Sequence, residues 1–447
     1  MRKILYLLII LVVMGACSMS KQVPEWVEQR PYNNEYYTAV VRFNKKAPNY
    51  VDLARDNALR EISTQISVQI DSDIYLKETE ANGIPSAELI SQIKSSSRNK
   101  LKDIQLYGTY ENDRDYWAYY RLSKSAYHAW RVQQRDLAIS QALKLMEEYD
   151  DASTGITAGI SSLLKALELV VDFTDLDLTA AYRGNEINLY NELFSRLQSL
   201  PETILIYLDP QNINMVAKLR RTASVSLNVK YNKESRIIAA SAFPLKYDFD
   251  SGAGDIVETG VTDTNGMAML VINRISSYSP QQSIYVTPDK AYWLQSLENP
   301  VIKQMFSILR FSPAKLNISV NKPRAFLIYS FDGKPGSSYK DMVVNKLQNL
   351  DMEVLTDIKA SDYTFRIEIV SHEGEYVNNL RLYSATADAN VELLDTRTGI
   401  SLFSTTVAGI KSTGNNRENA RKASELAAVN RICDNLMFSL VEQHIMR

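Results

Sequence analysis

The chain has 447 residues, of which 45% are hydrophobic and 23% are charged, and its formal net charge is −2. A chain of this length is expected to form several domains, and so mild a negative charge gives no electrostatic basis for binding nucleic acid. We therefore expect a folded, multi-domain protein without a nucleic-acid partner.

The amino-terminal residues are typical of a secretory signal. Arg2 and Lys3 provide positive charge, and residues 4–14 form an apolar run that is too short for a transmembrane helix, which needs roughly twenty such residues. The run closes with "MGAC", which ends at Cys17. This sequence resembles the lipobox of bacterial lipoproteins, although Met14 stands where leucine is usual. An ordinary cleaved signal followed by an unrelated cysteine is the alternative.

The lipobox resemblance implies that residues 1–16 are removed, that Cys17 carries the lipid anchor and that residues 17–22 form a tether. Ser18 is not the aspartate that retains some lipoproteins in the inner membrane. The expected location is therefore the outer membrane, with the membrane itself as a partner. The sequence "SMSKQVPEW" lacks an acidic cluster that might signal export to the cell surface, so we expect the protein to face the periplasm. Cys433 then has no partner for an internal disulfide, and its apolar, helical context predicts a buried thiol.

The first predicted domain covers residues 23–150. A strand at 35–43 is rich in β-branched and aromatic residues, and a helix follows that begins near Asn49 or Asp52, because apolar residues recur there at steps of three and four. The pattern then changes to alternation, which predicts a second strand through Ile66, Val68 and Ile70.

Two aromatic runs later in this domain predict a hairpin. They cover residues 103–110 and 115–122 and flank the turn-forming sequence "ENDR". A helix is expected from about Ser123. In the second run the side chains alternate between two sides of the strand. One side carries Tyr116, Ala118 and Tyr120, and the other carries Trp117, Tyr119 and Arg121.

One side of this strand must pack on the helices of the domain, and the other side is a candidate binding surface, because aromatic rings supply contact area at little entropic cost. Burial of both sides is the alternative.

These elements resemble the amino-terminal part of the lipoprotein-twenty family of outer-membrane lipoproteins and the first domain of flagellar assembly protein T. The resemblance is carried by "PEWV" at 24–27, "ARDNALREISTQISVQI" at 54–70 and "YWAYYRLSKSAY" at 116–127. It implies an α+β domain in the cell envelope. It implies no catalytic residues, because the family has no agreed set.

Residues 151–222 are predicted to be mainly helical and to connect two domains. Apolar residues at helical spacing predict helices over 155–173 and 187–200, and "TILIYLDP" at 203–210 predicts a short strand.

Residues 223–320 are predicted to form a β-sandwich, because short alternating runs are broken there by Gly, Asp and Asn. The sequence "VTDTNGMAMLVI" at 261–272 resembles the late hairpin of bacterial immunoglobulin-like and transthyretin-like domains.

Residues 321–447 predict a strand, a helix, several strands and a long closing helix. This order resembles the amino-terminal domain of TolB, on the sequences at 360–369, 391–409 and 420–432. The resemblance implies protein–protein contact in the envelope. The whole chain is thus expected to be α+β, with two small α+β domains on either side of helical segments and a sandwich.

No motif for catalysis or for a cofactor is evident. The three histidines, His128, His372 and His444, lie in unrelated contexts, and no G-x-S-x-G elbow is present, so we expect no metal, no cofactor and no catalytic residue. The sequence "DGKPGSS" at 332–338 is expected to be a tight loop rather than a phosphate cradle. Acidic residues within 247–263 suit either calcium or solvent-facing turns, and the sequence leaves both open.

These observations favour a lipid-anchored, non-catalytic envelope protein that acts as a scaffold or adaptor for an outer-membrane or periplasmic assembly, with other envelope proteins as partners. Two alternatives remain at this stage. One is a module that binds peptidoglycan glycan or peptide through the sandwich, and the other is a glycan-processing hydrolase whose acid and base are distant carboxylates.

Overall fold

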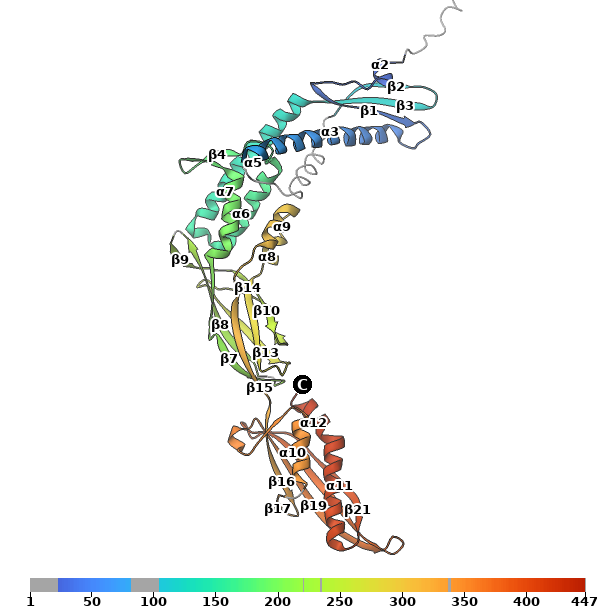
Figure 1. The fold of residues 1–447 in the computed structure, drawn as a ribbon, viewed down its shortest axis with the longest axis vertical. Coiled ribbons are helices and arrows are strands. Elements are labelled where there is room, and N and C mark those ends of the chain that lie inside the picture. Colours follow the sequence, from blue (N-terminus) through green and yellow to red (C-terminus); the bar gives the residue numbers. More distant parts are fainter. Residues whose placement is uncertain (1–22, 82–103, 220, 234, 337–338, 447) are drawn as a thin grey trace, which may run out of the picture. The chain divides into compact units, whose positions relative to one another are not determined.

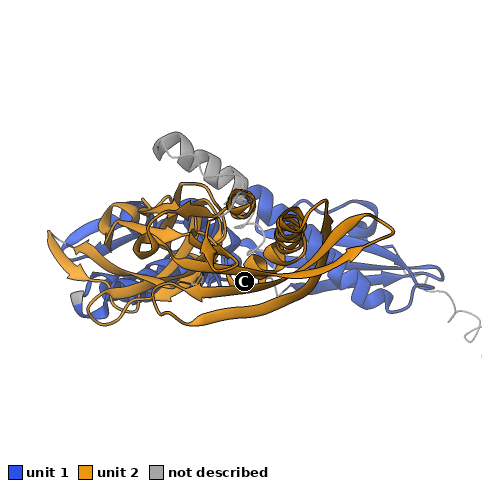
Figure 2. Cartoon of the chain, turned by 90° about the horizontal axis from the view of Figure 1, so that it is seen from below, with its two compact units in different colours: residues 1–200, 291–309 blue, residues 201–290, 310–447 orange. Residues whose placement is uncertain are grey.

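The computed structural model describes residues 23–81, 104–219, 221–233, 235–336 and 339–446. It has mixed α+β structure in several parts, as predicted. By backbone contacts the chain divides into two compact units, which are coloured separately in Figure 2. The first contains residues 1–200 and 291–309, and the second contains residues 201–290 and 310–447.

The first unit begins with α2 (Glu25–Glu28) and a three-stranded antiparallel sheet. Its strands are β1 (Tyr36–Asn44), β2 (Gln105–Glu111) and β3 (Asp115–Ser123), in the order β1-β3-β2. The long helix α3 (Tyr50–Ala81) runs along one face of this sheet (Figure 1). The predicted first strand, the helix start and the hairpin across residues 112–114 are therefore confirmed.

The predicted strand through Ile66, Val68 and Ile70 is wrong, because α3 continues through these residues to Ala81. Ile66 lies four residues after Ile62, and both are fully buried, whereas Val68 is 63% exposed. Burial thus follows the helical period of 3.6 residues, and the alternation of β-branched residues was coincidental.

The rest of the first unit is helical apart from one hairpin. Its helices are α5 (Lys124–Asp150), α6 (Ile156–Val170), α7 (Leu189–Thr203), α8 (Ala291–Leu294) and α9 (Pro300–Ile308). The start of α5 matches the prediction, and the Ser123 side chain caps it by accepting from the Ala126 N–H at 3.3 Å.

A short hairpin, β4 (Thr179–Tyr182) and β5 (Asn185–Asn188), interrupts the region predicted to be helical. Its two turn residues, Arg183 and Gly184, both have positive φ, as the tight turns of two-residue hairpins require.

Helices α8 and α9 belong to the first unit although the strands on either side of them in sequence belong to the second. The buried Trp293 of α8 donates its indole N–H to the Thr157 carbonyl of α6 at 3.1 Å. The Glu168 carboxylate of α6 accepts from the backbone N–H groups of Glu298 and Asn299, each at 2.7 Å. These bonds hold the two short helices against α6.

The β-rich part of the second unit contains two five-stranded sheets, with strand orders β12-β10-β14-β15-β7 and β11-β13-β8-β6, the latter joined by β9. Alternate apolar residues are buried on the strands of both sheets, which is the pattern of two sheets that share a core. The predicted strand at 203–210 is present as β6. The strands are β6 (Ile204–Asp209), β7 (Asn212–Val216), β8 (Ala223–Lys233), β9 (Arg236–Ala239), β10 (Pro244–Ser251), β11 (Gly254–Ile256), β12 (Thr259–Val261), β13 (Met267–Ile275), β14 (Gln281–Pro288) and β15 (Ala314–Asn321).

The carboxy-terminal part of the second unit has the predicted order of strands and helices. Its sheet has the order β17-β16-β19-β20-β21, with β18 paired to β16. Strand β16 is parallel to β18 and to β19, and the pairs β16-β17, β19-β20 and β20-β21 are antiparallel. The elements are β16 (Arg324–Phe331), β17 (Lys334–Pro335), α10 (Lys340–Asn349), β18 (Glu353–Leu355), β19 (Tyr363–Val377), β20 (Leu382–Asp395), β21 (Ser401–Gly414), α11 (Arg417–Arg431), a π-helical turn (Ile432–Leu436) and α12 (Met437–His444).

Cys433 lies in the π-helical turn and packs in the core of this part. Burial raises the pKa of its thiol above the ordinary value. The predicted buried thiol is therefore confirmed.

Candidate functional site

The candidate site is the face of the β1-β3-β2 sheet that lies opposite α3. On β3, Tyr116 and Ala118 are buried on the α3 side, and the Tyr116 ring packs against Tyr50 of α3 at 5.3 Å. Trp117, Tyr119 and Arg121 point to the other side, as the alternation predicts.

Aromatic rings from three elements meet on this second side. Tyr119 is at the centre, with Trp26 of α2 at 5.7 Å and Tyr107 of β2 at 4.8 Å between ring centroids. Beside them, Tyr110 of β2 packs against Trp117 at 5.5 Å. Such tilted and edge-to-face pairs contribute on the order of 1 kcal/mol each beyond their burial.

A β-bulge places Tyr107 in this group. The register between β2 and β3 shifts between Leu106 and Gly108, so Tyr107 is the extra residue of the bulge. A bulge redirects a side chain that regular alternation would place on the other side of the strand. Tyr107 therefore contacts Tyr119 and Arg121 while remaining 56% exposed.

Two arginines lie on these rings, and they differ in their partners. The Arg42 guanidinium lies 5.1 Å from the Trp117 ring centroid and forms an ion pair with Asp115 at 2.5 Å. The Arg121 guanidinium lies between two tyrosines, 4.7 Å from the Tyr36 centroid and 4.6 Å from the Tyr107 centroid.

Arg121 has no carboxylate within ion-pair distance among the residues that the structure describes. Its Nε is shielded from solvent and has no hydrogen-bond partner there. A guanidinium has five N–H donors in one plane, so within the described residues this side chain keeps donors for a partner. We call the group on this side of the sheet the aromatic–arginine face: Trp26, Tyr36, Arg42, Tyr107, Tyr110, Trp117, Tyr119 and Arg121.

Burial raises the pKa of Tyr119 above its ordinary value, with a further contribution from the neighbouring Tyr107. The central phenol is therefore neutral throughout the neutral pH range. The arginines are the charged groups of the face.

The other residues considered in the sequence are not brought together. Cys17 lies outside the described residues. His128 is exposed on α5, the His372 ring lies 3.2 Å from the Asp388 carboxylate on the carboxy-terminal sheet, and the His444 ring packs on Phe403 at 5.0 Å. Across the described ranges, no group of three or more His, Cys, Asp or Glu side chains is placed to hold a metal ion.

The acidic side chains at 247–263 engage individual partners. Asp248 pairs with Lys246 and Asp250 with Lys315, each at 3.0 Å. Asp263 accepts the backbone N–H groups of Asn265 and Met267, each at 2.8 Å, which is the geometry of a turn. These contacts agree with the interpretation of the acidic residues at 247–263 as residues of solvent-facing turns.

Asp332, at the start of the loop "DGKPGSS", binds other parts of its own domain. Its carboxylate accepts from the backbone N–H and the hydroxyl of Ser371, each at 2.7 Å, and from Arg421. Burial alone would raise the pKa of Asp332, but these hydrogen bonds and the Arg421 charge bring it below its ordinary value. Residues 337 and 338 of the loop lie outside the described residues.

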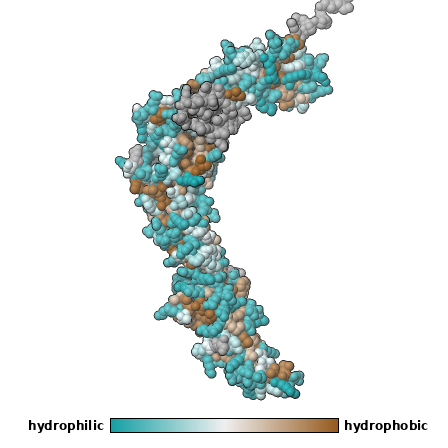
Figure 3. Space-filling model, viewed as in Figure 1, coloured by the Kyte–Doolittle hydropathy of each residue, from teal (hydrophilic) through white to brown (hydrophobic). Residues whose placement is uncertain are grey.

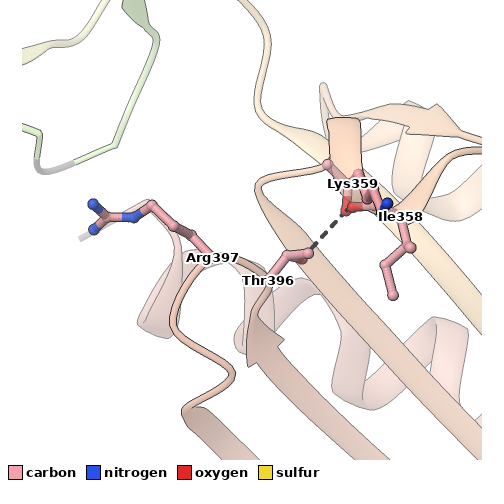
Figure 4. Close-up of a pocket in the computed structure, with 5 residues that line it drawn as sticks. Ile358, Lys359, Thr396 and Arg397 are labelled. Carbon is pink, nitrogen blue, oxygen red and sulfur yellow. Dashed lines mark hydrogen bonds between the residues drawn. The ribbon is translucent and has the colours of Figure 1, made fainter.

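A shallow pocket of about 400 Å³ lies in the carboxy-terminal part and is lined by Ile358, Lys359, Ser361, Thr396 and Arg397. The Ser361 and Thr396 hydroxyl oxygens are 3.2 Å apart. Figure 4 shows Arg397 extending away from Thr396 and Ile358, so the polar groups of this pocket do not converge on one point. The aromatic–arginine face is the better candidate for a site.

Sequence reasoning found Trp117, Tyr119 and Arg121 but missed the side chains that surround them. Tyr36 lies within the tyrosine-rich sequence "NNEYY", and Trp26 lies within "PEWV", which carries the family resemblance, but neither pattern indicated that the two side chains reach this face. No sequence signal pointed to Tyr107, because a β-bulge cannot be recognised from the alternation of residues.

No family model matches the chain, and no curated protein matches it. Among solved structures, lipoprotein GNA1162 from Neisseria meningitidis shows 15% identity over 25% of this chain and 99% of its own, with a TM-score of 0.18. The secreted protein HP1454 from Helicobacter pylori shows 9% identity over 91% of this chain and 100% of its own, with a TM-score of 0.23. Protein XCC0632 from Xanthomonas campestris, described as DUF330, shows 14% identity over 27% of this chain and 84% of its own, with a TM-score of 0.18. TM-scores this low assign neither fold nor function.

Among the described residues, no helix combines the length and the apolar character needed to cross a membrane.

Proposed function

We propose that this chain is a lipid-anchored protein of the bacterial envelope that acts without catalysis as a scaffold or adaptor. The observation that carries the proposal is the aromatic–arginine face, where Arg121 is held between Tyr36 and Tyr107 without a carboxylate among the described residues. Tyrosine, tryptophan and arginine are the residue types that contribute most to protein–protein binding.

The signal-like amino terminus supports the anchoring part of the proposal. In this proposal Cys17 receives the lipid and the protein resides at the outer membrane, facing the periplasm. Residues 18–24 separate Cys17 from the start of α2 and span at most about 25 Å however they are arranged. The aromatic–arginine face would then lie close to the membrane that holds the anchor, where envelope assemblies are found.

The proposal includes the family relationships that the sequence suggests. The first domain would be a lipoprotein-twenty-like domain, the β-rich part would be immunoglobulin-like or transthyretin-like, and the carboxy-terminal part would be similar to the amino-terminal domain of TolB. Of the three, the TolB resemblance implies contact between envelope proteins, and the lipoprotein-twenty resemblance implies an envelope location without established catalysis.

Site-specific photo-crosslinking in intact cells of the host tests the proposal. A benzophenone amino acid replaces Tyr107 on the face, and a control chain carries it at Tyr207, which is similarly exposed on β6. We expect envelope proteins to be captured from position 107 and not from 207, and the capture to be lost in Cys17→Ser, which lacks the anchor.

The same protein pattern from both positions, or capture that persists in Cys17→Ser, would contradict the adaptor proposal. Sedimentation of the purified chain with peptidoglycan examines the alternative of a cell-wall binding module. In that case binding should disappear when residues 223–320 are deleted.

A further inference from the structure

Arg121 differs from the other arginine of the face in that its charge is unpaired among the described residues. Arg42 also lies on an aromatic ring, but the Asp115 carboxylate neutralises it at 2.5 Å. Within the part of the chain that the structure describes, Arg121 has two rings and no carboxylate, and its Nε is shielded from water without an acceptor. An incoming carboxylate would therefore meet a guanidinium that has no competing acid among these residues.

The two edges of the sheet indicate the side from which a partner approaches. On β1, the Gln65 side chain of α3 donates to the Thr38 carbonyl at 2.7 Å and accepts from the Thr38 N–H at 3.3 Å, so this edge is closed at its middle. On β2, Leu106 and Tyr107 are 52% and 56% exposed. An edge strand with adjacent exposed apolar side chains is suited to contact with another chain.

The charges around the face favour a single carboxylate over a highly charged surface. The exposed acidic residues Glu25, Glu28, Glu35 and Glu111 lie on the elements that build the face or next to them. A sheet of anionic lipid headgroups would meet these carboxylates as well as the arginines. One acidic side chain flanked by apolar residues would reach Arg121 and avoid that repulsion.

We infer that the aromatic–arginine face binds an acidic segment of a partner protein, with a carboxylate of the segment on Arg121 and an apolar neighbour against Tyr107. The inference rests on the proposed adaptor function and adds the chemistry of the partner. The pairing resembles that of Arg42 with Asp115, with the carboxylate supplied by another chain.

Selection from a phage-displayed library of short random peptides tests this inference without knowledge of the natural partner. The target is the full chain with Cys17→Ser, purified without lipid. We expect selected peptides to share an Asp or Glu next to an aromatic or aliphatic residue. A synthetic copy of the strongest peptide should bind Arg121→Gln about tenfold more weakly or worse, since a charge-assisted hydrogen bond contributes about 1.5–3 kcal/mol.

Three further measurements make the test specific. The matched control is Arg114→Gln, because Arg114 is an exposed arginine in the neighbouring hairpin turn, and this change should alter peptide affinity less than twofold. Arg121→Glu should select basic peptides instead, which a merely unfolded variant would not do. Circular dichroism of each variant establishes that it remains folded.

The inference is overturned if selection yields no peptide, if the peptides lack acidic residues, or if Arg121→Gln binds them as well as the parent. It is also overturned if vesicles containing phosphatidylglycerol bind the chain through Arg121 while the peptides do not, since the occupant would then be lipid. If selection yields acidic peptides but the crosslinking experiment captures no envelope protein, the inferred preference of the face for a carboxylate stands and the adaptor proposal is refuted. The two failures are therefore distinguishable.

Discussion

Tyr247→Phe is expected to stabilise the β-rich part of the second unit. Tyr247 lies on β10 and is fully buried, and its hydroxyl has no hydrogen-bond partner among the described residues. The ring packs in the core, so phenylalanine keeps nearly all of its contacts. The substitution removes only an oxygen whose hydrogen bonds to water are lost on folding.

The expected gain follows from the cost of burying an unpaired hydroxyl. This cost is about 1–3 kcal/mol, and the small space left by the oxygen offsets part of it, so the free energy of unfolding should rise by about 1 kcal/mol at pH 7. Burial also raises the pKa of Tyr247 to about 12. The unfolded tyrosine deprotonates near pH 10 while the folded one remains neutral, so stability is fully present below pH 10 and falls between pH 10 and 12.

The alkaline loss attributable to Tyr247 is on the order of 2 kcal/mol, and Tyr247→Phe should remove it. Hydrogen exchange followed by mass spectrometry on peptides from β10 and β14 reports the opening free energy of this part without requiring the whole chain to unfold in one step. Lower protection in Tyr247→Phe than in the parent at pH 7 would refute the reasoning, because it would mean that the hydroxyl has a favourable partner.

Three further predictions concern buried polar groups. In the first unit, the Arg131 guanidinium donates two hydrogen bonds to the Asp175 carboxylate, at 2.7 and 2.9 Å. Arg131→Met or Asp175→Leu alone should lower the free energy of unfolding of that unit by about 3–5 kcal/mol, as measured by urea unfolding. The double variant should lower it by less than the sum of the two single effects. Burial alone would raise the pKa of Asp150, but its hydrogen bond with Arg196 contributes to bringing that pKa below the ordinary value. Stability should therefore fall as the pH drops below about 4. Asp150→Asn should reduce this acid dependence in thermal melts. Cys433 should resist alkylation by iodoacetamide at pH 8 in the native chain and react on unfolding, because burial raises its pKa.

Local patterns predicted the elements with strong periodicity. The hairpin of β2 and β3 was predicted because its turn residues separate two aromatic runs. The start of α5 was predicted near Ser123, and the structure shows that the Ser123 side chain caps it. The end of α3 was mispredicted since Ile66, Val68 and Ile70 satisfy a strand pattern locally, and only tertiary burial of Ile66 decides for the helix.

The site was predictable only in its centre. Alternation placed Tyr119 and Arg121 on one side of β3, but it could not show what packs on them. Trp26 reaches the face from α2, about ninety residues earlier in the chain, and Tyr107 reaches it through a bulge. Contacts between distant segments and a shift of register by one residue both lie outside what short-range periodicity contains.

The surface shown in Figure 3 is mostly hydrophilic, with apolar side chains in separate patches. Hydropathy alone therefore does not select a binding face, and the state of the arginines is more informative. Arg131 is paired with Asp175 inside the first unit, and Arg42 is paired with Asp115 at its surface. Arg121 has aromatic neighbours as Arg42 does but no such acid among the described residues.

If Arg121 binds acidic peptides because no carboxylate of the described residues pairs with it, a carboxylate introduced next to it in the chain should prevent that binding. Thr38 of β1 is directly opposite Arg121 of β3 in the sheet register, so the two side chains point to the same face. Thr38→Asp should therefore place a carboxylate beside the guanidinium and weaken binding of the acidic peptides at least tenfold. The Thr38 hydroxyl donates to the Pro31 carbonyl at 3.1 Å, and both Thr38→Asp and the control below lose this bond, so thermal stability is compared between the two variants. Thr38→Asn, which has the same shape without the charge, is the control and should bind nearly as the parent does. Equal loss in the two variants would mean that the shape of β1 and not the free charge of Arg121 governs binding.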